Sequence, residues 1–304
     1  MHAHAHSHDH GHAHHHHAPI GGRYSIAIAL NIAFVAIETL AGFWANSTAL
    51  LADAGHNVSD VLGLAMAGAG AWLSGRAPTS RRTYGFGKAG VLAALGNVLL
   101  LVGACGAIGW EAARRLAQPE PILPGVVTIV AGAGVLVNGA TALLFFRRRM
   151  NDVNARGAFL HMAADAGVSA AVILAGLAIY WTGALWIDPA MSLAVCAVIL
   201  WGAWGLTRES LDLALDAAPS GIDVDAVRRH LEALPGVTAV HDLHVWAMSA
   251  TEPALTAHLV LPGGGDDAFL ANAAAGLGKT FAIHHATLQV ERAHADACAE
   301  HAHP

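Results

Sequence analysis

Six long segments of the chain are apolar and poor in charged residues. They cover residues 24–45, 49–73, 89–113, 122–146, 155–181 and 186–206. Each is longer than the roughly 17 residues that an α-helix needs to cross the hydrocarbon layer of a bilayer. The pattern therefore predicts an α-helical membrane protein with six transmembrane helices.

The pattern changes after residue 207, where charged residues return and apolar positions repeat at helical or strand spacing. The expected elements are a helix over 224–234, strands over 237–248 and 254–261, a helix over 266–277 and a strand over 282–291. Their order, αββαβ, predicts a small α+β domain. The expected parts of the chain are a disordered His-rich arm (1–22), a membrane domain (23–207), the α+β domain (208–292) and a His/Cys tail (293–304).

Composition supports the membrane class, because 55% of the residues are apolar, 12% are charged and the mean hydropathy is +0.48. Basic residues near the ends of the spans then predict orientation, since their excess marks the cytoplasmic side. One side has ten, which are Arg23, Arg76, Arg81, Arg82, Lys88, Arg147, Arg148, Arg149, Arg156 and Arg208. The other side has two, Arg114 and Arg115. We therefore expect both termini and the α+β domain in the cytoplasm.

Several classes of protein and partner are not expected. No basic patch is interleaved with aromatic residues, so the expected partner is the lipid bilayer and not a nucleic acid. Cys105 and Cys196 lie inside spans and Cys298 in the tail, which gives no disulfide framework. The first residues are His-rich without an apolar core, unlike a cleavable signal peptide.

Two predicted spans carry a histidine and an aspartate four residues apart. His56 and Asp60 lie in the second span, and His161 and Asp165 lie in the fifth. Residues at i and i+4 share a helix face, and an aspartate inside a bilayer normally faces a partner or an aqueous path. The two pairs together supply two nitrogen and two oxygen ligands, a tetrahedral set that suits Zn²⁺. The alternative is a pair of interhelical hydrogen bonds, which explains two matched pairs less well.

The depth of these residues is compatible with one shared site. At about 1.5 Å per residue, Asp60 lies roughly 17 Å from the outer end of its span and Asp165 roughly 15 Å from the inner end of its own. We therefore expect the carboxylates to meet near mid-membrane. The histidines fall on opposite sides of them, so we expect the fifth span to begin earlier, near Asn151.

Other polar residues also lie within the predicted spans. Asp53 is interpreted as a helix-start residue or a support for the ligands, and Glu38 as a structural or a proton-carrying residue. The asparagines Asn31, Asn97 and Asn138 are expected to form interhelical hydrogen bonds.

From the first span to near the C-terminus, the chain resembles the cation diffusion facilitator family. The matching positions of the first two spans are Asn31, Phe34, Glu38, Gly42, Ser47, Leu50, Asp53, His56 and Asp60. The segment RGAFLHMAAD (156–165) is similar to the family's fifth span. The resemblance implies that His56, Asp60, His161 and Asp165 are transport-site ligands. It also implies a homodimer in a bacterial inner membrane that exchanges cytoplasmic metal for protons.

Members of this family with a histidine in the second-span motif typically carry zinc or cadmium. The implied function is Zn²⁺/H⁺ antiport by alternating access, with transport mainly of Cd²⁺, Co²⁺ or Ni²⁺ as the alternative. A membrane metal sensor is a second alternative. No enzyme is expected, because the chain has no HExxH motif and no span carries a recognisable Ser and His nucleophile arrangement.

The segment RTYGFGKAGVLAALGNVLLL (82–101) resembles the family's entry to the third span, where a lysine pairs with an aspartate after the sixth. Those positions are Lys88 and Asp212 here, which implies a hinge between the two parts of the chain; the alternative is a solvated loop lysine. Two positions depart from the family. Gly90 stands where many members carry a glutamate, and the loop 74–87 lacks histidine and aspartate ligands, so we expect no metal site in that loop.

Strand alternation in the α+β domain puts His244, His258, His285 and Glu291 on one sheet face. The resemblance implies a regulatory metal site there, with His241 as a substitute ligand at a strand end. The alternative is a His-rich polar or dimer-facing surface.

Ten of the first 17 residues are histidines, a composition that cannot bury a core. We interpret this segment as a flexible metal-gathering arm; an engineered tag fits less well, because the longest run is four. The tail 294–303 adds Cys298 and further histidines, as ligands or as a mobile end.

Overall fold

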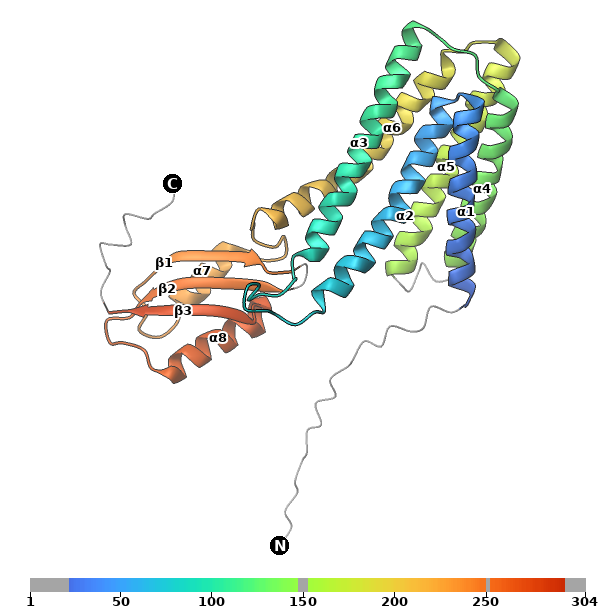
Figure 1. The fold of residues 1–304 in the computed structure, drawn as a ribbon. Coiled ribbons are helices and arrows are strands. Elements are labelled where there is room, and N and C mark those ends of the chain that lie inside the picture. Colours follow the sequence, from blue (N-terminus) through green and yellow to red (C-terminus); the bar gives the residue numbers. More distant parts are fainter. Residues whose placement is uncertain (1–21, 147–152, 250–251, 293–304) are drawn as a thin grey trace.

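The computed structural model describes residues 22–146, 153–249 and 252–292 and confirms the expected fold class (Figure 1). A bundle of long helices is followed by a small domain with a three-stranded sheet. The His-rich arm and the His/Cys tail lie outside the described residues, so the interpretations of both stay predictions.

The bundle contains six helices within the described residues. They are α1 (Gly22–Ala45), α2 (Thr48–Ser74), α3 (Ala89–Ala117), α4 (Pro124–Phe146), α5 (Val153–Thr182) and α6 (Ile187–Ala214). Most bounds lie within a few residues of the predicted spans. The exception is α6, which continues past the predicted end at 206 because its last turns leave the bundle toward the small domain (Figure 1).

The outer surface of the bundle is apolar, as a bilayer requires, and its buried polar side chains lie in the interior among apolar ones. Among the described helices, α3, α4, α5 and α6 are long and apolar enough to cross a membrane, and α1 is apolar over Asn31–Ala45. Large side chains such as Trp181 and Trp201 are about four-fifths exposed. The helix α2 is less apolar because it carries Asp53 and the predicted ligands.

A buried aspartate joins the start of α6 to the start of α2. Asp188 accepts hydrogen bonds from Ser47 Oγ at 2.5 Å, from Thr48 N at 2.7 Å and from Thr48 Oγ1 at 2.9 Å. Ser47 is also the N-cap of α2, where its hydroxyl accepts from Leu50 N. The carboxylate therefore satisfies donors that the start of α2 would otherwise leave unpaired inside the bundle.

The C-terminal domain contains α7 (Val224–Glu232), β1 (Ala239–Ala247), β2 (Pro253–Val260), α8 (Asp267–Phe281) and β3 (His285–Glu291). The strands β1 and β2 pair antiparallel, and β3 adds to β2 in parallel after the crossover through α8. Both helices cover one face of the sheet (Figure 1), and Leu231, Leu255 and Leu277 are fully buried between them. The opposite face of the sheet is left for polar side chains.

The loop between α2 and α3 lies against the C-terminal domain. A side chain at Gly87 would place its Cβ 2.6 Å from Met248 O, so the backbones meet too closely for any other residue. Lys88 forms an ion pair with Asp216, which corrects the expected pairing with Asp212. Because α6 runs on to Ala214, Asp212 is still helical and faces Arg208, while Asp216 follows in the connection.

We predict that Asp188→Ala lowers the free energy of unfolding by about 3 kcal/mol, because a buried donor without an acceptor costs about 1 to 3 kcal/mol. Thermal unfolding of the purified protein in detergent measures this loss. Asp212→Ala is the control, since that carboxylate is largely exposed and should change stability by less than about 0.5 kcal/mol. Equal losses in the two variants would contradict the role given to Asp188.

Candidate metal sites

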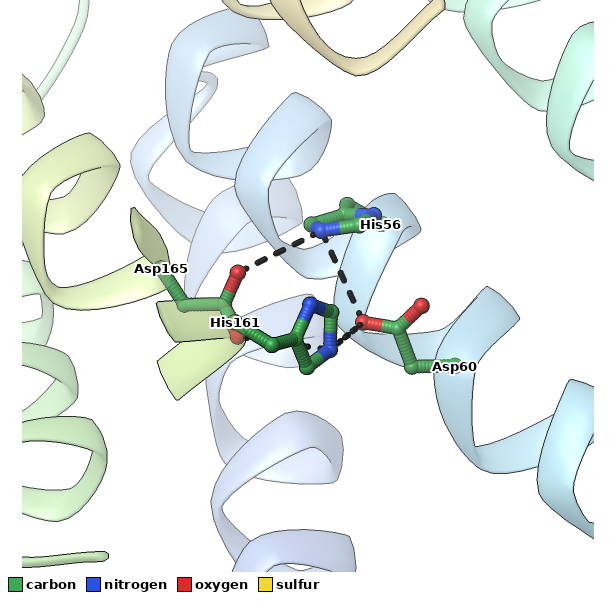
Figure 2. A group of neighbouring side chains, drawn as sticks. All are labelled: His56, Asp60, His161 and Asp165. Carbon is green, nitrogen blue, oxygen red and sulfur yellow. Dashed lines mark ion pairs between the residues drawn. The ribbon is translucent and has the colours of Figure 1, made fainter. Parts of the chain in front are cut away.

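The four side chains predicted to hold a metal point toward one another between two helices (Figure 2). His56 and Asp60 extend from α2, and His161 and Asp165 extend from α5. One ligand atom from each lies within 4.8 Å of all the others. Two imidazole nitrogens and two carboxylate oxygens at this separation form a donor set for a four-coordinate cation.

Each histidine faces the aspartate of the opposite helix. His56 Nε2 lies 3.4 Å from Asp165 Oδ1 and 3.5 Å from Asp60 Oδ2. His161 Nε2 lies 3.2 Å from Asp60 Oδ2 and 3.7 Å from Asp165 Oδ2. Because α2 and α5 run in opposite directions, the order His then Asp on one helix meets the order Asp then His on the other.

This crossed arrangement changes the expectation about depth. The two carboxylates do not lie at one depth with a histidine on either side of them. Instead, His56 lies beside Asp165 at one depth, and His161 lies beside Asp60 at the other. The described part of α5 begins two residues before the predicted start at 155, and the start near Asn151 stays a prediction. The helix α5 begins at Val153, and Asn151 lies outside the described residues.

A cavity of about 860 Å³ connects this four-residue group to one end of the bundle. Its walls come mainly from the second half of α2 and the first halves of α3 and α5, which is the end nearest the C-terminal domain (Figure 1). Asp60 and His161 line it with side chains 36% and 44% exposed, whereas the Asp165 side chain is 3% exposed. The group is therefore accessible through this cavity from the side of the C-terminal domain.

The lining of this cavity is suited to cations. Asp60 and Asp165 are its charged groups, and neither lysine nor arginine is present among the described lining residues. Asp165 Oδ2 is buried and has no hydrogen-bond partner within the described chain. A cation among the four ligands would give that oxygen a partner and offset two negative charges in a low-dielectric setting.

A second polar layer lies one helical turn beyond the ligands. Glu38 and Asp53 are both fully buried. Asn57 Nδ2 donates to Glu38 Oε2 at 3.0 Å, and Ser169 Oγ donates to Asp53 Oδ2 at 2.8 Å. The sequence had not singled out Asn57 or Ser169, although Asn57 adjoins a predicted ligand and Ser169 lies four residues after Asp165.

The three asparagines expected to bond between helices are placed differently from one another. Asn31 and Asn97 line the cavity, and Asn138 is buried in α4. Asn97 lies against Gly63 of α2, where a Cβ would be 2.6 Å from its amide nitrogen. Asn97 Oδ1 and Asn138 Nδ2 have no hydrogen-bond partner among the described atoms.

A second group of possible ligands lies on the polar face of the C-terminal sheet. His241 Nε2 is 3.0 Å from Glu291 Oε2, and His258 Nδ1 is 3.0 Å from Glu291 Oε1. The two imidazole rings are 5.1 Å apart between centroids. His241, His258 and Glu291 therefore offer a three-ligand set, one residue from each strand.

A β-bulge brings His241 to this face. His241 pairs with His258 and His244 pairs with Thr256, so β1 has one residue more than β2 between these pairs. Asp242 takes up the extra residue with φ of 51°. Regular alternation would have turned His241 inward with Leu243, and the bulge reverses that direction for the residues before it. His241 therefore belongs to the three-ligand set with His258 and Glu291, whereas the sequence predicted it only as a substitute ligand at a strand end.

The structure does not bring the other two predicted histidines into the three-ligand set. His244 Nε2 contacts Asp242 Oδ1 at 3.0 Å, and Asp242 Oδ2 lies 3.6 Å from His258 Nε2, so His244 is a neighbour. His285 shares a face with Glu291 but begins the same strand that Glu291 ends, about 20 Å away at about 3.3 Å per residue. Its ring packs against Tyr84 of the α2–α3 loop, 5.7 Å between centroids.

The acids of the sheet face are kept charged. The hydrogen bond with His244 lowers the pKa of Asp242 below its usual range. Burial acts to raise the pKa of Glu291, but the hydrogen bond with His241 and the nearby His258 outweigh it, so the pKa is lowered. Both carboxylates are therefore ionised at neutral pH, the form in which they bind cations.

Two family models match the chain. The cation efflux transmembrane domain matches residues 25–213, and the cytoplasmic domain of cation efflux proteins matches residues 219–293. Together they cover both parts of the structure.

Curated relatives match most of the chain. The zinc transporter ZitB of Escherichia coli K12 is 36% identical over 272 residues, 88% of this chain and 87% of its own. The metal cation efflux system protein CzcD of Cupriavidus metallidurans is 33% identical over 77% of this chain and 74% of its own. The cadmium, cobalt and zinc/H⁺-K⁺ antiporter of Bacillus subtilis is 31% identical over 78% and 76%.

Proposed function

The chain belongs to the cation diffusion facilitator family of divalent-metal efflux transporters, which are not enzymes, and we propose that it exports zinc from the cytoplasm in exchange for protons. The observation that carries this proposal is the convergence of His56, Asp60, His161 and Asp165 on one point between α2 and α5. These four residues are the proposed transport site.

Zinc is the metal that this donor set suits best. Imidazole nitrogen is a better ligand for Zn²⁺ than for Mg²⁺ or Mn²⁺, and two carboxylates balance the charge of a divalent ion. Cd²⁺, Co²⁺ and Ni²⁺ accept the same ligands, and cadmium and cobalt appear in the name of the Bacillus relative. We therefore propose zinc as the main substrate and these ions as weaker ones.

Proton exchange follows from the ligands themselves. A histidine nitrogen or a carboxylate oxygen binds either a metal or a proton through the same lone pair, so metal binding displaces protons and proton binding displaces metal. In the proposed cycle, zinc enters through the cavity, is enclosed by a movement of the helices, and leaves on the other side when the ligands are protonated. In the structure, the cavity lies on the side of the C-terminal domain.

Orientation and assembly complete the proposal. The excess of basic residues supports an orientation with both termini and the C-terminal domain in the cytoplasm of a bacterial cell, and in this proposed orientation the cavity faces the cytoplasm. The match to the cytoplasmic domain of cation efflux proteins supports a homodimer. The group of His241, His258 and Glu291 is the proposed regulatory site, and the ion pair between Lys88 and Asp216 is the proposed hinge.

We expect His161→Ala and Asp60→Ala each to reduce zinc flux driven by a pH gradient by at least about tenfold, since even a residue that only supports a metal ligand contributes that much. Flux is measured in proteoliposomes with a fluorescent zinc indicator inside. Asp212→Asn is the control, because this exposed carboxylate lies outside the site. Undiminished flux in either ligand variant would refute the transport site, and zinc binding without flux in the wild type would indicate a sensor.

His56→Asp should shift the preference of the transport site from zinc toward harder ions. The substitution replaces a nitrogen ligand with an oxygen, which favours Mn²⁺ relative to Zn²⁺. The measurement is the ratio of zinc to manganese flux in wild type and variant at equal metal concentrations, with an expected fall of about tenfold, or about 1.4 kcal/mol. An unchanged ratio would mean that selection occurs at another place.

His258→Ala should remove zinc binding at the regulatory site, whereas His285→Ala should not. His258 contacts Glu291 directly, and His285 lies at the far end of β3. Zinc bound per chain is measured by equilibrium dialysis with Asp60→Ala in both proteins. The His-rich arm is the same in both, so its contribution cancels. Equal binding by the two variants would overturn the three-residue assignment.

A further inference from the structure

Two carboxyl groups lie together, fully buried, next to the proposed transport site. Glu38 comes from the middle of α1 and Asp53 from the first turns of α2. Asp53 precedes His56 by three residues, and its partner Ser169 follows Asp165 by four, so the pair lies about one helical turn from the ligands. It lies on the side of the ligands away from the cavity, toward the connection between α1 and α2.

Each carboxyl group has one oxygen with a partner and one without. Asn57 donates to Glu38 Oε2 and Ser169 donates to Asp53 Oδ2, and both donors are neutral. The remaining oxygens, Glu38 Oε1 and Asp53 Oδ1, are buried and have no hydrogen-bond partner within the described chain. Asp53 and Asn57 are four residues apart on α2 and share a helix face, so the contact between Asn57 and Glu38 places the two carboxyl groups next to each other. One proton shared by these two oxygens would satisfy both.

Among the described residues, no lysine or arginine forms an ion pair or hydrogen bond with either carboxyl group. The charged or titratable groups that face it are His56 of α2 and Asp165 of α5. The helix α4 carries no charged residue over Pro124–Phe146, and Asp188 of α6 is occupied by Ser47 and Thr48. Two ionised carboxylates in contact, buried and without a cation, are strongly unfavourable.

We propose that Glu38 and Asp53 form a proton-binding dyad that holds one proton when the transport site is free of metal and releases it when a divalent cation binds there. The proposal rests on the proposed function of the four ligands. The step moves one proton and no electrons: a carboxylic acid hydrogen-bonded to a carboxylate becomes two carboxylates. The charge of the cation, one turn away, compensates the added negative charge, and the proton returns when the cation leaves.

The dyad adds a proton to the exchange that the metal ligands do not supply. Protons on the four ligands compete with metal for the same lone pairs, whereas the dyad responds only through charge. Loss of either acid should therefore change the number of protons released per zinc while leaving the ligands intact. A purely structural hydrogen bond between α1 and α2 would change stability and leave the proton count unaltered.

The test counts protons released on zinc binding by the purified full-length protein in weakly buffered detergent with a pH indicator. Glu38→Gln should release about one proton fewer per zinc than wild type, because the glutamine amide donates to Asp53 without a titrating proton. Asp53→Asn should give the same deficit, and the double variant no further one. Ser192→Ala, which removes another buried hydroxyl without a partner, is the matched control and should equal wild type.

Infrared difference spectroscopy is a second measurement. Its result for wild type does not depend on whether a variant folds. Wild type should lose the carbonyl band of a protonated carboxylic acid on zinc addition at neutral pH, and this loss should be absent from Glu38→Gln. No such loss in wild type, or the same loss in the folded variant, overturns the dyad. Retained zinc binding with an unchanged proton count also overturns it while leaving the transport site standing. Unchanged zinc binding in His161→Ala would instead refute the transport site, and with it the premise on which the dyad rests.

Discussion

A carboxylate buried among membrane helices needs hydrogen-bond donors, a proton or a cation, and the bundle satisfies its carboxylates in different ways. Asp188 receives three donors from the start of α2 and is saturated. Asp165 is almost as deeply buried, yet its contacts are two histidines that also have metal-binding lone pairs. The first arrangement holds helices together. The second leaves a negatively charged group that suits the proposed binding of a cation.

The spacing of the four side chains along α2 and α5 determines how they meet. A histidine and an aspartate four residues apart lie on the same face of a helix. Because α2 and α5 are antiparallel, the histidine of each helix lies opposite the aspartate of the other. Neither helix alone has more than two ligands, so the site exists only while α2 and α5 are held at the observed separation. The cavity reaches the site from one side because α2 and α3 leave space beside Asp60 and His161. A small relative movement of the two helices would change both the access to the group and the distances between its side chains, as the proposed alternating access requires.

The sequence predicted the spans, the αββαβ order and the four side chains that meet between α2 and α5 because each depends on local spacing. It could not predict features that depend on a broken repeat or on contacts between distant segments. Strand alternation assumes an unbroken strand, and the bulge at Asp242 reverses the direction of His241. The same rule grouped His285 with Glu291 on a face without giving their distance along the strand. The family resemblance implied a pair of Lys88 with Asp212, whereas the structure pairs Lys88 with Asp216, because α6 continues to Ala214.

The connection between the two parts of the molecule depends on the short segment before α3. Gly87 fits against Met248 only because it has no side chain, and the next residue, Lys88, pairs with Asp216 after α6. The helix α3 begins directly after this lysine, and its residues Gly90 and Asn97 form part of the cavity wall. Any displacement of the C-terminal domain therefore acts on the start of a helix that lines the path to the ligands. An exposed ion pair alone contributes less than about 1 kcal/mol, so the close backbone contact at Gly87 is the firmer part of this connection.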